Sequence, residues 1–190
     1  MNQKEAFRKP ALFDKNFKEI LSFQLLSLIG GLIAGSLLAW KVEALYLIPG
    51  LFILIPGLME MRGGIAGPLA SRISSGLFLK VIDQRHPSAR ILRGNVLASF
   101  ILTLLASALL GIMALALTFI ITGKLVLVLL PIALIAALLA NIVEIPLTIA
   151  LTLMLFSARH DPNNIMGPLI TSVGDILGTL ALIITTALLI

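Results

Sequence analysis

Acidic side chains lie inside the most apolar part of this sequence, where an ionised group is costly. Asp175 is near the middle of an apolar run over residues 165–190. A carboxylate at the centre of a membrane-spanning helix costs ~2.5–3.5 kcal/mol on insertion scales, so such groups usually face a bundle interior or a water-filled path. Thr171 and Gly167 precede Asp175 by one and two helical turns and share its face. Asp175 is therefore either a cation ligand that lines a pore, or a protonated or arginine-paired group that holds helices together.

A second carboxylate, Glu144, lies within the apolar run over residues 125–157. Asn141 precedes it by three residues, and Pro146 follows it by two. Because a proline frees a backbone carbonyl in the preceding turn, this segment offers several oxygen atoms. They could bind a cation, or they could form a hydrogen-bonded site between packed helices.

Glu60 and Arg62 stand at the inner end of the second apolar run, where they could simply pair with each other at the membrane surface. All of the polar candidates within the apolar runs offer oxygen, which suits Mg²⁺, Ca²⁺ or Mn²⁺ better than zinc or copper. The sequence has no cysteine, and its two histidines fall in connecting segments. No nucleophile–base arrangement and no cofactor motif is visible. We therefore expect neither an enzyme nor a bound cofactor.

The composition places these residues in a membrane. Of the 190 residues, 59% are hydrophobic and only 12% are charged, and the mean hydropathy is +1.11. A soluble domain of this size cannot cover its surface with so few polar groups. The composition excludes a soluble enzyme, a disordered chain and a disulfide-rich scaffold. It predicts an all-α, multi-pass protein of the cell membrane.

The apolar runs predict five transmembrane helices behind a charged tail. Residues 1–18 are expected to form a cytoplasmic tail with a short amphipathic helix, and residues 19–190 a five-helix membrane domain. Residues 60–80, rich in Gly and Ser, could continue the second helix or fold back. Loops are expected over residues 81–93 and 159–164. The predicted spans are 19–40, 44–59, 94–122, 125–157 and 165–190.

The basic residues set the predicted orientation. If the amino terminus is cytoplasmic, all 14 Lys and Arg residues except Lys41 and Lys124 fall in cytoplasmic segments. This asymmetry predicts a cytoplasmic amino terminus and, with an odd number of spans, an external carboxyl terminus. It also explains the net charge of +5 by contact with membrane lipid, without a nucleic-acid partner.

Two segments resemble the membrane domain of MgtE-type magnesium transporters. Residues 63–77, GGIAGPLASRISSGL, resemble the inner end of that family's second helix and are closest to its solute-carrier-like archaeal and eukaryotic relatives. Residues 161–175, DPNNIMGPLITSVGD, resemble the family's last loop and last helix. The residues that match the second pattern are Asp161, Pro162, Asn164, Pro168, Thr171 and Asp175.

The resemblance implies a homodimeric channel or transporter for Mg²⁺, with the pore between the second and fifth helices. It implies that Asp175 binds the ion and that Thr171 and Gly167 face the pore. We also expect residues 60–76 and the turn over residues 159–164, which contains Asp161, to form the inner mouth. One Asp175 per chain is too little charge for a selective divalent site, and a two-fold axis along the pore would supply a second one.

One departure from the family pattern is Gly64, which replaces the usual asparagine of the second helix. Glu60 or backbone carbonyls could then supply the ligand on that side. Two alternatives stay open at this point. The chain could be a Na⁺- or H⁺-coupled Mg²⁺ exchanger, or a non-transporting membrane scaffold in which Asp175 and Glu144 hold helices together.

Overall fold

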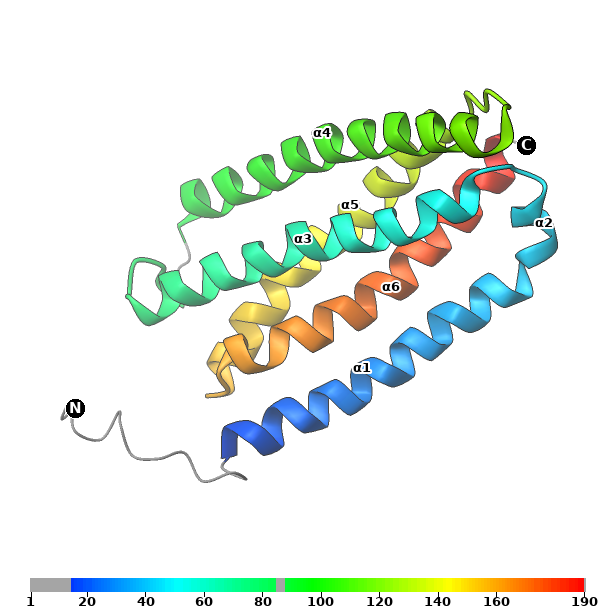
Figure 1. The fold of residues 1–190 in the computed structure, drawn as a ribbon. Helices are drawn as coiled ribbons and strands as arrows, with labels where there is room; N and C mark the ends of the chain where they lie inside the picture. The colour runs from blue at the N-terminus through cyan, green and yellow to red at the C-terminus, as the bar shows by residue number, and fades with distance from the viewer. Residues whose placement is uncertain (1–14, 85–87, 190) are drawn as a thin grey trace.

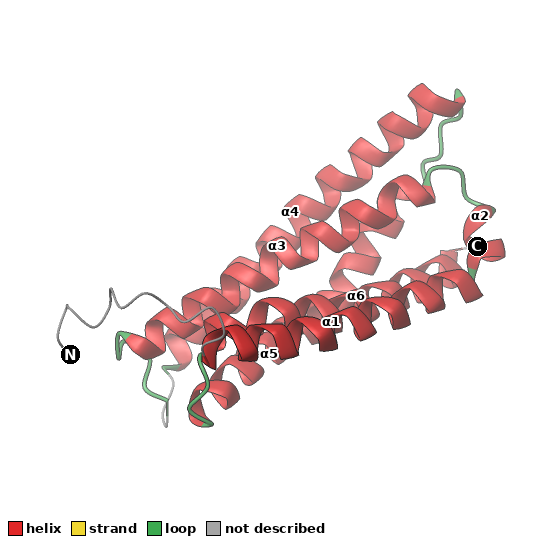
Figure 2. Ribbon diagram, turned by 60° about the horizontal axis from the view of Figure 1, so that its bottom comes forward, coloured by secondary structure: helices red, strands yellow, loops and turns green. Residues whose placement is uncertain are grey.

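The computed structural model describes residues 15–84 and 88–189, and these residues fold into α-helices joined by short connections. Figure 1 shows the long helices side by side along one common direction, with the short α2 at one end of the bundle. The turned view in Figure 2 shows the same alignment. The elements are α1 (Lys15–Trp40), α2 (Val42–Tyr46), α3 (Leu51–Phe78), α4 (Ala89–Thr122), α5 (Leu129–Ser157) and α6 (Pro162–Leu189).

Four of the helices are long and apolar enough to cross a membrane, so the predicted all-α, multi-pass architecture is confirmed. These four are α1, α4, α5 and α6. The remaining long helix, α3, has 28 residues but is less apolar, because Glu60, Arg62 and several Gly and Pro residues lie within it.

Helix α3 is continuous, so residues 63–78 extend the second apolar segment and do not fold back. Pro56 and Pro68 lie inside the helix without ending it. Membrane helices tolerate such prolines because neighbouring groups satisfy the freed carbonyls. The left-handed backbone of Gly50, with φ of 83°, separates α3 from α2.

Two predicted loops are shorter than expected. Helix α4 begins at Ala89, inside the segment 81–93, and α6 begins at Pro162, inside the segment 159–164. A proline in the first helical turn is favourable, because its missing N–H would have no partner there. The amphipathic helix predicted for the tail falls mainly on residues 1–14, which lie outside the described residues, while residues 15–18 form the first turn of α1.

The helices differ in how far they are enclosed. Helix α3 contacts α4, α5 and α6, whereas α1 lies at the edge of the bundle and packs chiefly against α6. Small residues allow the close approach of α1 and α6: the backbone of Gly30 lies directly against the side chain of Ser172. A Cβ atom at Gly30 would overlap the Ser172 hydroxyl, whereas one at Gly31 would meet no atom within 4 Å.

We therefore expect Gly30→Val to force α1 away from α6 and to destabilise the protein. Overpacking of this kind costs ~1–3 kcal/mol. Thermal unfolding of the purified protein in mild detergent should show a lower melting temperature for Gly30→Val. The matched control is Gly31→Val, which adds the same side chain on the adjacent open face. Equal melting temperatures for the two variants would contradict the observed packing of α1 on α6.

Candidate functional site

A groove of about 520 Å³ lies between α3 and α6. It brings together several of the predicted site residues: Asp175, Thr171 and Gly167 on one wall and Glu60 on the other. The spacing of four residues places the α6 residues on one helix face, as the sequence indicated. The complete lining is Pro56, Met59, Glu60, Gly63 and Gly67 of α3 with Gly167, Ile170, Thr171 and Asp175 of α6.

The polar atoms in this groove are oxygens. The side chain of Asp175 keeps 29% of its surface exposed, and Glu60 is exposed on the facing helix. The Thr171 hydroxyl donates to the carbonyl oxygen of Gly167 over 2.9 Å. Its own lone pairs stay available, because a hydroxyl that donates one hydrogen bond can still accept others. The groove can therefore surround a hard cation or its water shell with oxygen.

Both walls also contain a proline directly after a glycine that lines the groove, Pro68 in α3 and Pro168 in α6. Because proline has no N–H, the carbonyl four residues earlier loses its usual helical partner. These are the carbonyls of Gly64 and Asn164. The sequence thus removes one backbone hydrogen bond from each of the two helices beside the groove.

Arg62 lies behind the groove and is almost completely buried, with 1% of its side chain exposed. Its Nη1 donates to Glu144 Oε2 over 2.8 Å, and its Nη2 approaches Asp175 Oδ1 at 3.4 Å. Nη2 also lies 3.3 Å from Met59 Sδ, and Nε has no hydrogen-bond partner among the described residues. One guanidinium therefore joins the groove carboxylate of α6 to a buried carboxylate of α5.

Two glycines of α6 make room for this guanidinium. A Cβ atom on Gly174 would lie 2.5 Å from Glu144 Oε1 and 2.8 Å from Arg62 Nη1. A Cβ atom on Gly178 would lie 2.5 Å from Arg62 Nε. Real Cβ atoms do not approach other atoms this closely, so the ion pair depends on glycine at both positions.

The surface pairing of Glu60 with Arg62 considered from the sequence is wrong, because Arg62 points into the bundle and Glu60 into the groove. A signal for this burial was present. Arg62 follows Leu58 by four residues and precedes Leu69 by seven, so it lies on one apolar helical stripe with them. All three side chains are buried.

The other predicted site residues lie outside the groove, and each has a protein partner. Glu144 is 1% exposed and contacts Arg62 from α5. Asn141 donates through Nδ2 to Thr103 Oγ1 over 2.6 Å and so joins α5 to α4. Asp161 accepts a hydrogen bond of 2.9 Å from a backbone N–H in the first turn of α6. The structure does not bring these three residues together with Glu60 or Thr171.

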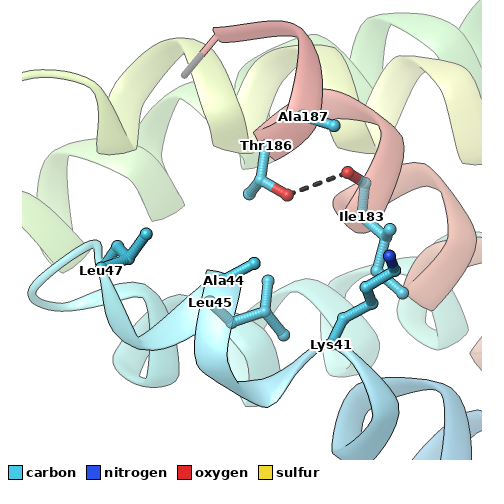
Figure 3. Close-up of a pocket in the computed structure, with 7 residues that line it drawn as sticks. All are labelled: Lys41, Ala44, Leu45, Leu47, Ile183, Thr186 and Ala187. Carbon is cyan, nitrogen blue, oxygen red and sulfur yellow. Dashed lines mark hydrogen bonds between the residues drawn. The ribbon is translucent and has the colours of Figure 1, made fainter.

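A further cavity, of about 250 Å³, lies at the end of the bundle that carries α2 (Figure 3). No side-chain carboxylate of the described residues lines it. Its polar groups belong to Lys41 and Thr186, and the Thr186 hydroxyl donates to the carbonyl of Ile183 in its own helix over 2.9 Å. The charged side chain in this lining is a cation, Lys41, which would repel a metal ion. Its lining is Lys41, Ala44, Leu45, Leu47, Ile183, Thr186 and Ala187.

Residues 55–185 match the MgtE family, which is described as "Divalent cation transporter". The matched region contains both walls of the groove as well as Arg62 and Glu144. No individual curated protein matches the chain.

The contact of Asn141 with Thr103 makes it possible to distinguish a structural role of Asn141 from a role as a cation ligand. Asn141→Leu and Thr103→Val remove the same buried hydrogen bond from opposite sides. Such bonds between membrane helices contribute ~0.6 kcal/mol on average and up to ~1.7 kcal/mol. We expect both variants to lower the melting temperature by similar amounts and both to retain most cation uptake in liposomes. Loss of uptake in folded Asn141→Leu alone, with Thr103→Val unaffected, would instead make Asn141 a ligand.

Proposed function

This chain belongs to the MgtE family of divalent cation transporters, and we propose on that basis that it carries Mg²⁺ across the membrane as a homodimer. The observation that carries the proposal is the groove between α3 and α6. Two carboxylates of different helices, Asp175 and Glu60, and the hydroxyl of Thr171 line it, and each of these side chains retains exposed surface. In this proposal the grooves of the two protomers face each other and form the pore.

The chemistry and size of the groove favour Mg²⁺. Oxygen ligands suit this hard cation, which sheds its water reluctantly and usually keeps several waters when bound. Since one water occupies ~30 Å³, six waters around an ion need roughly 180 Å³. The groove of about 520 Å³ in one protomer accommodates such a hydrated ion. Asp175, Thr171 and Gly167 would hold it mainly through its water shell.

A dimer would complete the charge of the site. Within residues 15–84 and 88–189, no group of three or more His, Asp or Glu side chains is placed to hold a metal ion. Asp175 is also partly neutralised by Arg62. A two-fold axis along the groove would add a second Asp175 and a second Glu60. The dimer would thereby offer four carboxylates around one path.

In this proposal α3 is a fifth membrane span. Its 28 residues give a length of about 42 Å, which exceeds the ~30 Å hydrocarbon core. Arg62 is shielded from lipid, and Glu60 faces the groove, so neither charge prevents insertion. Lys41 directly precedes α2, and Lys124 follows the last residue of α4, Thr122. Figure 1 shows α2 and the end of α4 at the same end of the bundle, which would be external, and the amino terminus would be cytoplasmic.

The exposure of Asp175 favours transport over a purely structural role. A carboxylate that only holds helices together is expected to be enclosed by its partners, as Glu144 is at 1% exposure. Asp175 instead keeps 29% of its surface open to the groove. A Na⁺- or H⁺-coupled exchanger would use the same groove, and Mg²⁺ flux that requires a Na⁺ or proton gradient would identify it.

Neutralising Asp175 tests the ion site directly. Asp175→Asn keeps the shape of the side chain but removes one negative charge from each protomer, and its insertion cost is lower than that of Asp. We expect normal yields of folded dimer and a fall in Mg²⁺ flux of about tenfold or more, since a neutral amide offsets less of the ion's dehydration cost. Both quantities should be measured on the same liposome preparation. Glu43→Gln, an exposed carboxylate of α2, is the control, and near-normal flux in Asp175→Asn would remove Asp175 from the site.

Cross-linking tests the dimer. The sequence has no cysteine, so single cysteines can be introduced without background. We expect Thr171→Cys, in the groove, to link to its own copy with a short bismaleimide in native membranes. Ile120→Cys, whose parent side chain is 75% exposed on α4, should stay monomeric on the gel. Mg²⁺ transport by a protein that remains a monomer would overturn the proposed pore.

A further inference from the structure

We infer that Arg62 is a tethered cation that competes with the transported ion for Asp175, and that Glu144 sets the strength of this competition without binding the ion. The inference rests on the proposed ion site at Asp175. It assigns roles to two buried residues that lie outside the groove lining.

The guanidinium is held unequally by its two carboxylates. The 2.8 Å contact between Nη1 and Glu144 is a strong, charge-assisted hydrogen bond. The 3.4 Å contact between Nη2 and Asp175 is longer than a normal hydrogen bond of this type. Arg62 is thus bound chiefly to Glu144 and only loosely to Asp175, which leaves Asp175 partly free to interact elsewhere.

Asp175 stands between Arg62 and the groove. Its Oδ1 faces the guanidinium, while the side chain retains exposed surface towards the groove. A cation that enters the groove therefore meets a carboxylate with a positive neighbour. Away from bulk water, charges at this range interact strongly. Arg62 must lower the affinity of Asp175 for cations, and the repulsion on a divalent ion is twice that on a monovalent ion.

The positive charge at this position is permanent. Arginine does not lose its proton in proteins. Gly174 and Gly178 close around the guanidinium so tightly that no Cβ fits beside it, and 1% of the side chain is exposed. Arg62 is therefore shielded from water, and in this proposal the motion that matters is a small shift of the guanidinium between Glu144 and Asp175.

Glu144 governs that shift. While it is ionised, it draws the guanidinium away from Asp175. If Glu144 is neutral, Asp175 becomes the remaining charged partner of Arg62 among the described residues. The guanidinium then moves closer to Asp175 and competes more strongly with the ion. Glu144 thereby affects the ion affinity of Asp175 indirectly, through the position of the Arg62 guanidinium.

The test is equilibrium binding of Mn²⁺ and Mg²⁺ to the full-length protein in detergent, measured by titration calorimetry. We expect Glu144→Gln to weaken divalent binding by about fivefold or more, because Arg62 then pairs with Asp175. Arg62→Gln alone would leave Glu144 buried without a partner, which is strongly destabilising. The double variant Arg62→Gln/Glu144→Gln avoids this, because it leaves no charge without a partner and its two amides can hydrogen-bond to each other.

Ion binding by the double variant distinguishes competition by Arg62 from a positioning role of Arg62 and from a ligand role of Glu144. Competition predicts that it binds Mn²⁺ about fivefold or more tightly than the wild type, with a smaller gain for Na⁺, since the removed repulsion scales with ion charge. Arg72→Gln, the same substitution at an exposed position of α3, should change binding by less than about twofold because exposed charges are screened by solvent. Weaker binding by the folded double variant would overturn the inference. It would show that Arg62 positions Asp175 or that Glu144 is itself a ligand.

Mn²⁺ binding by Asp175→Asn distinguishes a failure of this inference from a failure of the proposed function. If Asp175→Asn binds Mn²⁺ like the wild type, the proposed ion site is wrong, and the inference falls with it. If Asp175→Asn loses binding but the double variant gains none, the ion site stands and competition by Arg62 is wrong. Loss of binding in Asp175→Asn together with tighter binding in the double variant supports both.

Discussion

An arginine buried in an apolar helical bundle must be surrounded by opposite charge, and the packing of α3, α5 and α6 follows from this requirement. Burial of an ion costs several kcal/mol even after relaxation, and arginine cannot escape the cost by losing a proton. Arg62 is therefore met by Glu144 from α5 and Asp175 from α6. It also needs the space that Gly174 and Gly178 provide. Each of these residues is unfavourable in an isolated membrane helix, and together they compensate for one another.

The cluster of Arg62, Glu144 and Asp175 also links helix packing to the groove. If both carboxylates are ionised, the cluster has one negative charge in excess, and the more exposed of its carboxylates is the one that faces the groove. Glu144 is enclosed, whereas Asp175 is 29% exposed. The excess charge is thus available where α3 and α6 leave space, and the backbone of both helices is weakened beside it by Pro68 and Pro168. Helix packing and the proposed ion binding therefore depend on one set of side chains.

The sequence predicts features that depend on local spacing and composition. Of the five spans predicted from the apolar runs, four correspond to described helices that are long and apolar enough to cross a bilayer. The shared face of Asp175, Thr171 and Gly167 follows from their spacing of four residues. Partners from other helices are not encoded locally. The contacts of Asn141 with Thr103 and of Glu144 with Arg62 join residues far apart in the chain. The glycines and prolines of α3 are compatible with a helix, a kink or a turn, and only tertiary packing selects among these.

The placement of a fixed positive charge beside the proposed ion site resolves a conflict between two requirements. Asp175 must be ionised to attract a cation, yet an ionised carboxylate without a counter-ion is costly within the membrane. Arg62 stabilises the empty site by supplying that counter-ion, and the same charge opposes an arriving ion. A path for ions requires binding that is favourable enough to fill the site and weak enough to empty it. In the proposed site, a guanidinium held at 2.8 Å by Glu144 and at 3.4 Å from Asp175 would serve both conditions, because it stabilises the empty site and opposes an arriving ion.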